Sequence, residues 1–557
     1  MSRWWLGSVA MALALVVSGL LIPAGDTRAQ TVKPYAESTS PDYTMRVLLS
    51  VSDRVRETSD SSKEYQMVGI PDGLGAHTNT NNTVSVYMNH ELLTTDKSQP
   101  VIGGVMNRGA FVSKWTVLAD GSVAAGERAY DTVFIEDTLF GPAPQDDNQT
   151  PAFGRFCSGY LAGPQNGFDR YIYLAGEETD GSATFSGKGA EAVAIFDNEL
   201  HVLPKLGKFA KENIVVMPGS GDQTVVMGLE DGPSGPVSQL YMYVGTKDRR
   251  ANATPLQKNG LVGGKLYVFG SINKYTNNEG AFPSGFIVGQ WAEIANPETL
   301  SEAQLETAAT AAGAFGFVRM EDGAFSKTNN NDFYFVTTGG NKAAGNEFGR
   351  LYHMRFSSQG VLGNPVLTVV YNADTIIAAG GDTAISPDNI GVSADYIMVQ
   401  EDGHSATRPV MAAKKRDGSI WRFQLNNATG PTPVNLSSGT IVAALVPPGR
   451  DSTAVGAGIW ETSGIIDTSA EFGAGSWLFV VQAHSPTAAP GTGTVEDGQL
   501  LLMKPVAATA DAAYDPKAPA AFRNTPGLFR ALQWAIDRAF ATRPAANRPT
   551  PAGLLGY

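Results

Sequence analysis

The sequence has a single cysteine, Cys157, among 557 residues. An intramolecular disulfide is therefore excluded, so stability must come from an apolar core and from any bound metal ions. Only six histidines are present. The sequence contains no P-loop, no His-Glu-x-x-His, no Gly-x-Ser-x-Gly and no EF-hand loop. These absences argue against the common sites of nucleotide hydrolysis, zinc proteolysis and serine hydrolysis.

Positive charge is also scarce. The chain has 41 Lys and Arg residues against 54 Asp and Glu residues, which gives a formal net charge of −13. Such an acidic protein repels phosphate backbones, so we expect no nucleic-acid partner. The same acidity suits a protein that collects cations.

The first residues predict a secretory signal. Arg3 precedes an apolar run over residues 4–23, and small residues precede Gln30. We expect residues 1–29 to be cleaved, which places the mature protein in the periplasm or outside the cell. The alternative is an uncleaved anchor helix, because the apolar run approaches the length of a membrane span. No later charge-free segment has that length, so we expect no stable membrane insertion after cleavage. We also expect a monomer.

Short β-type segments dominate the rest of the sequence, and helical periodicity is scarce. Runs rich in aromatic and β-branched residues, bounded by Gly, Asn, Asp, Ser or Pro, predict strands at 83–88, 171–175, 239–245, 265–270, 332–337, 350–356, 396–400, 419–425 and 476–482. A weak Gly-x-Leu/Ile-aromatic repeat recurs at irregular spacing. This pattern favours an all-β fold, a β-propeller of roughly six blades over residues 65–505, rather than two sandwiches in series. Residues 30–64 are expected to form an N-terminal extension.

Two segments predict helices. Residues 300–312 form one candidate. In the segment 506–557, residues 524–540 place four large apolar side chains on one side, and a Pro/Ala-rich tail follows. We expect this C-terminal helix to pack on the main domain rather than to reach a partner.

Acidic residues recur beside the predicted strands. Four Glu-Asp-Gly triplets occur, at 230–232, 321–323, 401–403 and 496–498. Further acidic or amide groups occur at 89–91, 177–178 and 387–389. One triplet alone is better explained by turn chemistry. Together, however, adjacent carboxylates at strand ends favour a cation between them, and hard oxygen ligands suit calcium or ferric iron.

In order along the chain, these motifs resemble the PhoX-type alkaline phosphatase family of exported enzymes. The resemblance extends over residues 65–425. It rests on the segments 69–76, 89–91, 156–159, 176–178, 228–232, 264–268, 319–322, 387–389 and 401–403.

This resemblance implies a propeller whose centre holds Fe³⁺ and Ca²⁺ and hydrolyses small-molecule phosphate monoesters, with diesters as further substrates. By position, Cys157, Glu230 and Glu321 would bind iron, whereas Glu178 and Asp231 would bind calcium or bridge the metals. Arg319 would be catalytic by binding the phosphate, although a salt bridge to a neighbouring acid explains it equally well. Further candidate metal ligands are Asn89, His90, Glu91, Glu177, Asp388, Glu401 and Asp402.

The sequence also departs from the family pattern. The loop between Cys157 and Glu177 lacks a Thr-Pro-Trp-Gly motif, no second phosphate-binding basic residue is evident upstream of Cys157, and the signal lacks twin arginines. Two alternatives therefore stay open. One is a calcium-dependent propeller hydrolase that acts on lactones or phytate. The other is a non-catalytic, calcium-stabilised propeller that binds a partner.

Overall fold

The computed structural model describes residues 33–506, except 233–234, 236, 403–404, 406–407, 426–438, 446–459 and 485–492. The predicted signal peptide and the predicted helix over 524–540 lie outside the described residues. Strands dominate the rest, so the all-β class is confirmed. Within the described part, no helix is long and apolar enough to cross a membrane.

Six antiparallel four-stranded units make up the described chain. Unit 1 comprises β5 (Pro71–Thr78), β6 (Val84–His90), β9 (Phe111–Val117) and β10 (Val123–Arg128). Unit 2 comprises β13 (Phe156–Ala162), β14 (Ile172–Glu177), β15 (Ala192–Phe196) and β16 (Glu199–Val202). Unit 3 comprises β17 (Lys211–Val216), β18 (Gln223–Glu230), β19 (Leu240–Thr246) and β20 (Lys265–Ser271).

The second half of the chain repeats this plan. Unit 4 comprises β22 (Met320–Phe325), β23 (Asp332–Thr337), β24 (Arg350–Arg355) and β25 (Val366–Asn372). Unit 5 comprises β26 (Pro387–Val392), β27 (Tyr396–Glu401), β28 (Ser419–Gln424) and β29 (Thr440–Leu445). Unit 6 comprises β30 (Glu461–Asp467), β31 (Trp477–Ala483), β32 (Asp497–Pro505) and β2 (Tyr43–Ser50). All nine strands predicted from the sequence overlap strands of these units.

Additional elements decorate the units. β21 (Phe286–Ile294) pairs with β20 and β25, which joins units 3 and 4 in one sheet. The remaining strands are β1 (Ala36–Ser38), β3 (Arg54–Glu57), β4 (Glu64–Gln66), β7 (Lys97–Ser98), β8 (Asn107–Arg108), β11 (Thr132–Ile135) and β12 (Thr138–Pro142). The α-helices are α1 (Pro255–Lys258), α2 (Glu302–Ala311), α3 (Ala373–Ala378), α4 (Pro409–Lys414) and α5 (Ser469–Phe472). Helix α2 lies within the predicted segment 300–312.

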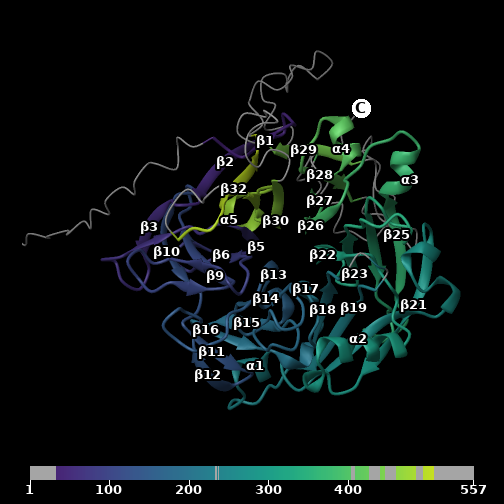
Figure 1. Cartoon of the computed structure of the whole chain (residues 1–557), viewed down its shortest axis with the longest axis horizontal. Coiled ribbons are helices and arrows are strands. Elements are labelled where there is room, and N and C mark those ends of the chain that lie inside the picture. Colours follow the sequence, from purple (N-terminus) through teal and green to yellow (C-terminus); the bar gives the residue numbers. More distant parts are fainter. Residues whose placement is uncertain are drawn as a thin grey trace, which may run out of the picture.

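The first strands of the six units contact one another in a closed circuit. In order, β5 contacts β13, β13 contacts β17, β17 contacts β22, β22 contacts β26, β26 contacts β30, and β30 contacts β5 again. Figure 1 shows these strands around the middle of the molecule, with the later strands of each unit further out. The circuit is held closed by strand pairing across the chain, because β2 pairs with β32 and β1 pairs with β29.

The apolar core lies between neighbouring units. Each of the six buried clusters joins two adjacent units, such as Leu174 of unit 2 with Ile214 of unit 3, or Val86 of unit 1 with Leu478 of unit 6. Both faces of a middle strand are therefore covered, which explains the continuous apolar runs in the sequence. Apolar side chains fill the spaces between units. Polar side chains lie at the starts of the first strands, where these strands meet at the centre.

Candidate metal centre

A β-bulge lies near the start of every first strand. The pairing register shifts between Pro71 and Leu74, Phe156 and Gly159, Lys211 and Asn213, Met320 and Gly323, Pro387 and Ile390, and Ser463 and Ile465. A bulge bends its strand and changes the direction of a side chain. In five units the bulge contains an acid or the cysteine, namely Asp72, Cys157, Glu212, Glu321 and Asp388.

A second repeated feature fixes another position in four of the six units. Ile70, Arg155, Arg319 and Ser386 have left-handed φ values of 50°, 45°, 51° and 49°. Each lies two residues before a bulge residue, and such strained backbone is concentrated at functional sites. Their carbonyl oxygens accept the amides of Glu91, Glu178, Thr338 and Asp402, the residues that follow the second strands, at 2.8–3.0 Å. The same local structure thus brings two side chains per unit toward the centre.

Eight of these side chains form four overlapping sets of metal-type ligands. The sets are Asp72, Glu91 and Cys157; Cys157, Glu178 and Glu212; Glu178, Asp231 and Glu321; and Glu212, Glu321 and Asp388. Within each set the ligand atoms lie within 4.8 Å of one another. We call these eight residues the central cluster. Because successive sets share members, the cluster is continuous across units 1–5.

Burial makes negative charge unfavourable in the central cluster. It raises the pKa of Asp72, Glu178, Glu321 and Asp388 well above the ordinary value, and neighbouring carboxylates add to the effect. Burial also raises the pKa of Glu212 to about 8. These acids can be charged together only if positive charge lies among them.

Two observations indicate that the cluster fits metal ions. Asp72 Oδ1 and Glu212 Oε2 are buried and accept no hydrogen bond within the described part of the chain. Burial, together with the charges of Asp72 and Glu212, raises the pKa of Cys157, whose Sγ–H lies 3.3 Å from Asp72 Oδ2. A metal would replace that proton and occupy the unpaired oxygens. A thiolate with several carboxylates is a donor set for highly charged cations.

Two arginines lie over the cluster at equivalent positions of units 2 and 4. Arg155 donates to Glu91 at 2.7 Å and lies 2.9 Å from Glu178. Arg319 donates two hydrogen bonds to Asp231, at 3.1 and 2.9 Å, and lies 3.2 Å from Glu321. Both side chains are partly exposed, whereas the carboxylates beneath them are buried. The sequence indicated Arg319 but not Arg155.

Several residues predicted as ligands lie outside the four sets. Glu177 accepts three backbone amides, those of Gly154, Phe185 and Glu191, at 2.8–2.9 Å. Glu401 pairs with Arg416 at 2.8 Å. Successive side chains of a strand point to opposite faces. In each of the pairs Glu177-Glu178, Glu230-Asp231 and Glu401-Asp402, the first acid therefore points into the units and the second toward the centre.

The segment 89–91 is divided in the same way. Glu91 belongs to the central cluster, whereas the buried His90 ring contacts Gly69 O at 3.1 Å and Ser113 Oγ at 2.7 Å. Asn89 donates to Cys157 O at 2.6 Å and so supports the bulge that carries the thiol. Asp402 is outside the sets, but its charge raises the pKa of Glu321 and Asp388.

Asp72 and Glu212 are cluster members that the sequence did not indicate. Asp72 lies in a Pro-Asp-Gly segment that has the composition of a turn, and Glu212 has no Gly-containing motif around it. Ser158 Oγ donates to Glu212 at 2.6 Å, and Gln482 Nε2 donates to both Asp72 and Glu91 at 2.9 Å. Their shared signal is the position at a first-strand bulge, which becomes visible only once the strand pairing is known.

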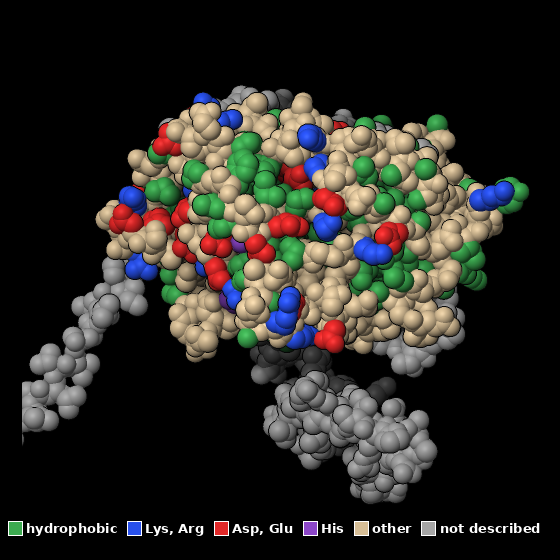
Figure 2. Space-filling model, turned by 90° about the horizontal axis from the view of Figure 1, so that it is seen from below, with side chains coloured by type: hydrophobic (Ala, Val, Ile, Leu, Met, Phe, Trp, Pro, Cys, Tyr) green, Lys and Arg blue, Asp and Glu red, His purple; other side chains and the backbone are tan. Residues whose placement is uncertain are grey.

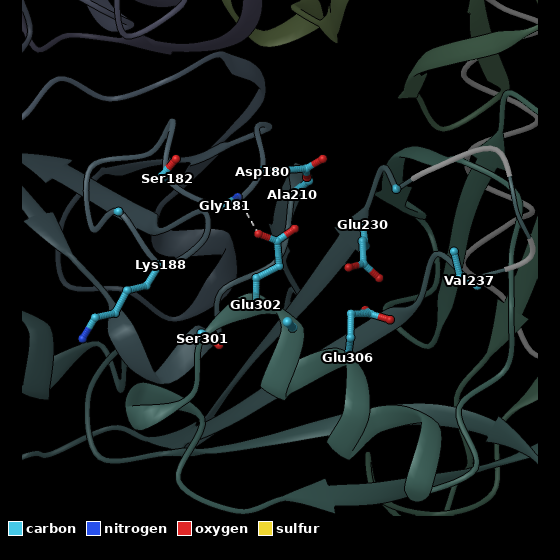
Figure 3. A pocket seen from close by; sticks show the side chains of 13 residues that line it. Asp180, Gly181, Ser182, Lys188, Ala210, Glu230, Val237, Ser301, Glu302 and Glu306 are labelled. Carbon is cyan, nitrogen blue, oxygen red and sulfur yellow. Dashed lines mark hydrogen bonds between the residues drawn. The ribbon is translucent and has the colours of Figure 1, made fainter.

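A second acidic site, which we call the side pocket, adjoins the centre. It has a volume of about 540 Å³, and its acids are Asp180, Glu230, Glu302 and Glu306. Figure 3 shows Glu230 and Glu306 pointing toward one another, and the Gly181 amide donating to Glu302, at 2.7 Å. Glu230 accepts the amide of Gln239 at 2.8 Å. The structure thus places Glu230 in this pocket rather than among the four sets.

The outer surface provides a third environment for acids. On the face shown in Figure 2, Asp and Glu side chains lie among Lys, Arg and apolar side chains. Exposed pairs such as Lys265–Glu293, at 2.9 Å, are typical of a solvated surface. The concentration of buried acids at the centre is therefore a feature of the fold and not only of the acidic composition.

Part of the chain matches the model of a known family. Residues 198–443 match the family model described as alkaline phosphatase PhoX, so the predicted resemblance to this family is confirmed. The structure of PhoX from Pseudomonas fluorescens, in complex with vanadate, is similar with a TM-score of 0.58 and 15% identity, covering 83% of this chain and 95% of that chain. A protein of unknown function from Dyadobacter fermentans gives a TM-score of 0.38 at 8% identity, covering 84% and 99%. No curated protein sequence matches the chain.

Proposed function

We propose that this chain, which is similar to the PhoX alkaline phosphatases, is a six-bladed β-propeller that hydrolyses phosphate esters at a metal centre in the central cluster. The six four-stranded units and the closed circuit of their first strands support the propeller. Phosphate monoesters are the expected substrates, and diesters are a further class. The observation that carries the proposal is that Cys157 and seven carboxylates form continuous ligand sets.

The composition of each set suggests its metal. The sets that contain Cys157 suit Fe³⁺ rather than Ca²⁺, because a thiolate binds transition metals such as iron whereas Ca²⁺ takes oxygen ligands. The two sets made only of carboxylates suit Ca²⁺, which prefers oxygen ligands. Glu230 is left out of this assignment because it faces the side pocket. When bound, the metals would supply a Lewis acid that polarises the phosphoryl group and lowers the pKa of water.

The protein's own residues bind and orient the phosphate. The Arg319 guanidinium is already oriented by its two hydrogen bonds to Asp231, and its partly exposed fork can receive two phosphate oxygens. Because a fixed fork needs no reorganisation as charge develops on those oxygens, it stabilises the transition state more than the ground state.

The deciding experiment is elemental analysis of the purified protein together with a p-nitrophenyl phosphate assay at alkaline pH. We expect iron and calcium in the protein, and turnover that a chelator abolishes. Calcium without iron and without phosphatase turnover would contradict the proposal. That outcome would favour the non-catalytic binding propeller, whereas turnover of lactones or phytate with calcium alone would favour the calcium-dependent hydrolase.

We further propose that the protein is exported and works as a monomer. Cleavage of residues 1–29 would remove none of the described residues, and we expect these to form one metal-binding domain, since β1 and β2 pair with the last units. N-terminal sequencing of protein recovered from the periplasm or medium tests the cleavage. Size-exclusion chromatography with light scattering tests the monomer.

A further inference from the structure

One arginine near the centre, Arg408, has no hydrogen-bonded or ion-paired partner among the residues that the structure describes. Arg155 pairs with Glu91 and Glu178, and Arg319 pairs with Asp231 and Glu321. Arg408 makes no hydrogen bond and no ion pair with any residue that the structure describes, although its side chain is partly buried. Withdrawing a guanidinium from water without a partner costs free energy, and an anion that binds it recovers part of that cost.

The position of Arg408 places it at the rim of the central cluster. It directly precedes α4, and its Nη2 lies 3.8 Å from where a Cβ on Gly340 would stand. Gly340 follows the end of β23, where unit 4 has Thr338 at the position that is acidic in units 1, 2, 3 and 5. Among units 1–5, unit 4 is the one without an acid at this position. The Arg408 guanidinium therefore lies beside the position that lacks a carboxylate.

Three charged groups act on Arg408, namely Asp402, Arg319 and Glu347, and none of them forms an ion pair with it in the described part of the chain. Burial lowers the pKa of Arg408, while the charges of Asp402 and Arg319 act on it in opposite directions. Burial and the charge of Asp402 raise the pKa of the neighbouring Glu461, and Glu347 lies 3.3 Å from Lys342. Arg319 is bound to Asp231. Its positive charge repels that of Arg408, and no described carboxylate is bonded to Arg408. A ligand anion would relieve both the repulsion and the desolvation.

We infer that Arg408 binds a second phosphate group of the substrate, next to the phosphoryl group held by Arg319. The preferred substrates would then be phosphate anhydrides, or esters with two adjacent phosphates, rather than simple monoesters. The reason is charge and geometry: Arg319 is the arginine oriented over Asp231 and Glu321, so Arg408 is left for the group beyond the scissile bond. This inference rests on the proposed function.

The test compares two substrates in the metal-loaded protein. We expect Arg408→Gln to lower kcat/KM for pyrophosphate about tenfold to hundredfold more than kcat/KM for p-nitrophenyl phosphate, which is the loss typical of one charged hydrogen-bonding group. Arg408→Lys should recover part of the difference. Arg249→Gln, which removes an exposed arginine paired with Asp222, is the matched control and should not change the ratio. Equal losses on both substrates, or no loss, would overturn the inference.

Calorimetric binding separates this inference from the proposed function. We expect the Kd for pyrophosphate to rise about tenfold or more in Arg408→Gln, with a smaller rise for orthophosphate. If the wild-type protein binds pyrophosphate through Arg408 but hydrolyses neither substrate, the anion site stands and the phosphatase proposal fails. If the wild-type protein hydrolyses p-nitrophenyl phosphate but the wild type and Arg408→Gln bind pyrophosphate equally, the phosphatase proposal stands and the anion site at Arg408 fails.

Discussion

The central cluster and the side pocket are built from the same two loops, yet only one of them has the spacing of a metal centre. The loop after β14 gives Glu178 to the centre and Asp180 to the pocket, and the end of β18 gives Asp231 and Glu230 in the same way. In the described chain, the pocket acids form no set within 4.8 Å. The difference is the contribution of the bulged first strands, which add Cys157, Glu212 and Glu321 on the central side only.

The comparison teaches that acid content alone does not make a metal site. Each of Glu230, Glu302 and Glu306 accepts a hydrogen bond from a protein donor. Glu230 and Glu306 point toward one another, and the charge of Glu306 adds to burial in raising the pKa of Glu230. In the described chain, however, no third acid lies close enough to complete a set with them. At the centre eight buried ligands lie close together, so the cations that we propose would offset the repulsion among the acids. Substitutions in and around the central cluster, with controls in the side pocket, test this difference.

The largest expected effect is on Cys157. Cys157→Ala removes the ligand shared by two sets, so we expect loss of iron and a fall in activity of more than about 100-fold. The folded structure should persist, because the thiol contributes little to the apolar core. Elemental analysis, activity and circular dichroism measure the three quantities. Unchanged iron content in a folded variant would remove Cys157 from the proposed centre.

The next effect contrasts two arginines at equivalent positions. Arg319→Ala should lower kcat about 100-fold to 1000-fold without loss of metal, because it removes a donor that stabilises charge on the phosphoryl group. Arg155→Ala serves as the comparison, since Arg155 binds Glu91 and Glu178 on the other side of the cluster. Steady-state kinetics and metal analysis are measured for both variants. Full activity of Arg319→Ala would show that the arginine has only a structural salt bridge.

A third prediction uses adjacent glutamates. Glu178→Gln should weaken metal binding about tenfold to 100-fold. Glu177→Gln should keep the metal but lower the free energy of unfolding by about 1–3 kcal/mol, because the Glu177 carboxylate accepts three buried amides. Metal titration and chemical denaturation measure these effects, and Asp180→Asn on the pocket side is the control for both. The result opposite to expectation would be metal loss in Glu177→Gln with normal binding in Glu178→Gln.

The smallest effect is a pH dependence of the metal-free protein. Burial raises the pKa of Glu212 and of Glu461 from the ordinary 4.5 to about 8. Between these values the folded state keeps protons that the unfolded state has lost, so stability falls as pH rises through this window. Thermal unfolding of chelated protein should give a higher Tm at pH 5 than at pH 8. Bound metal should reduce or reverse this trend, and a metal-free Tm that rises with pH would contradict it.

The sequence predicted the strands because their signal is local. The segment 332–337 coincides with β23, and Leu300 to Ala312 contains α2, since aromatic and β-branched runs and helical patterns are properties of short segments. The acidic pairs were also visible. The sequence did not show which member of each pair faces the centre, because that depends on the alternation of side chains along the strand and on where the strand ends. Glu230 and Asp231 are equivalent in the sequence and opposite in the structure.

The sequence by itself determined the all-β class, the scarcity of positive charge, and the resemblance that Cys157 and the Glu-Asp-Gly triplets carry. Only the tertiary structure decided that Asp72 and Glu212 join Cys157, because their positions depend on bulges in strands paired across units. It also decided that strands near the two ends of the described chain, β2 and β32, close one sheet. Short-range patterns report burial of a segment, whereas the meeting of charges from five units requires the long-range pairing that folding alone establishes.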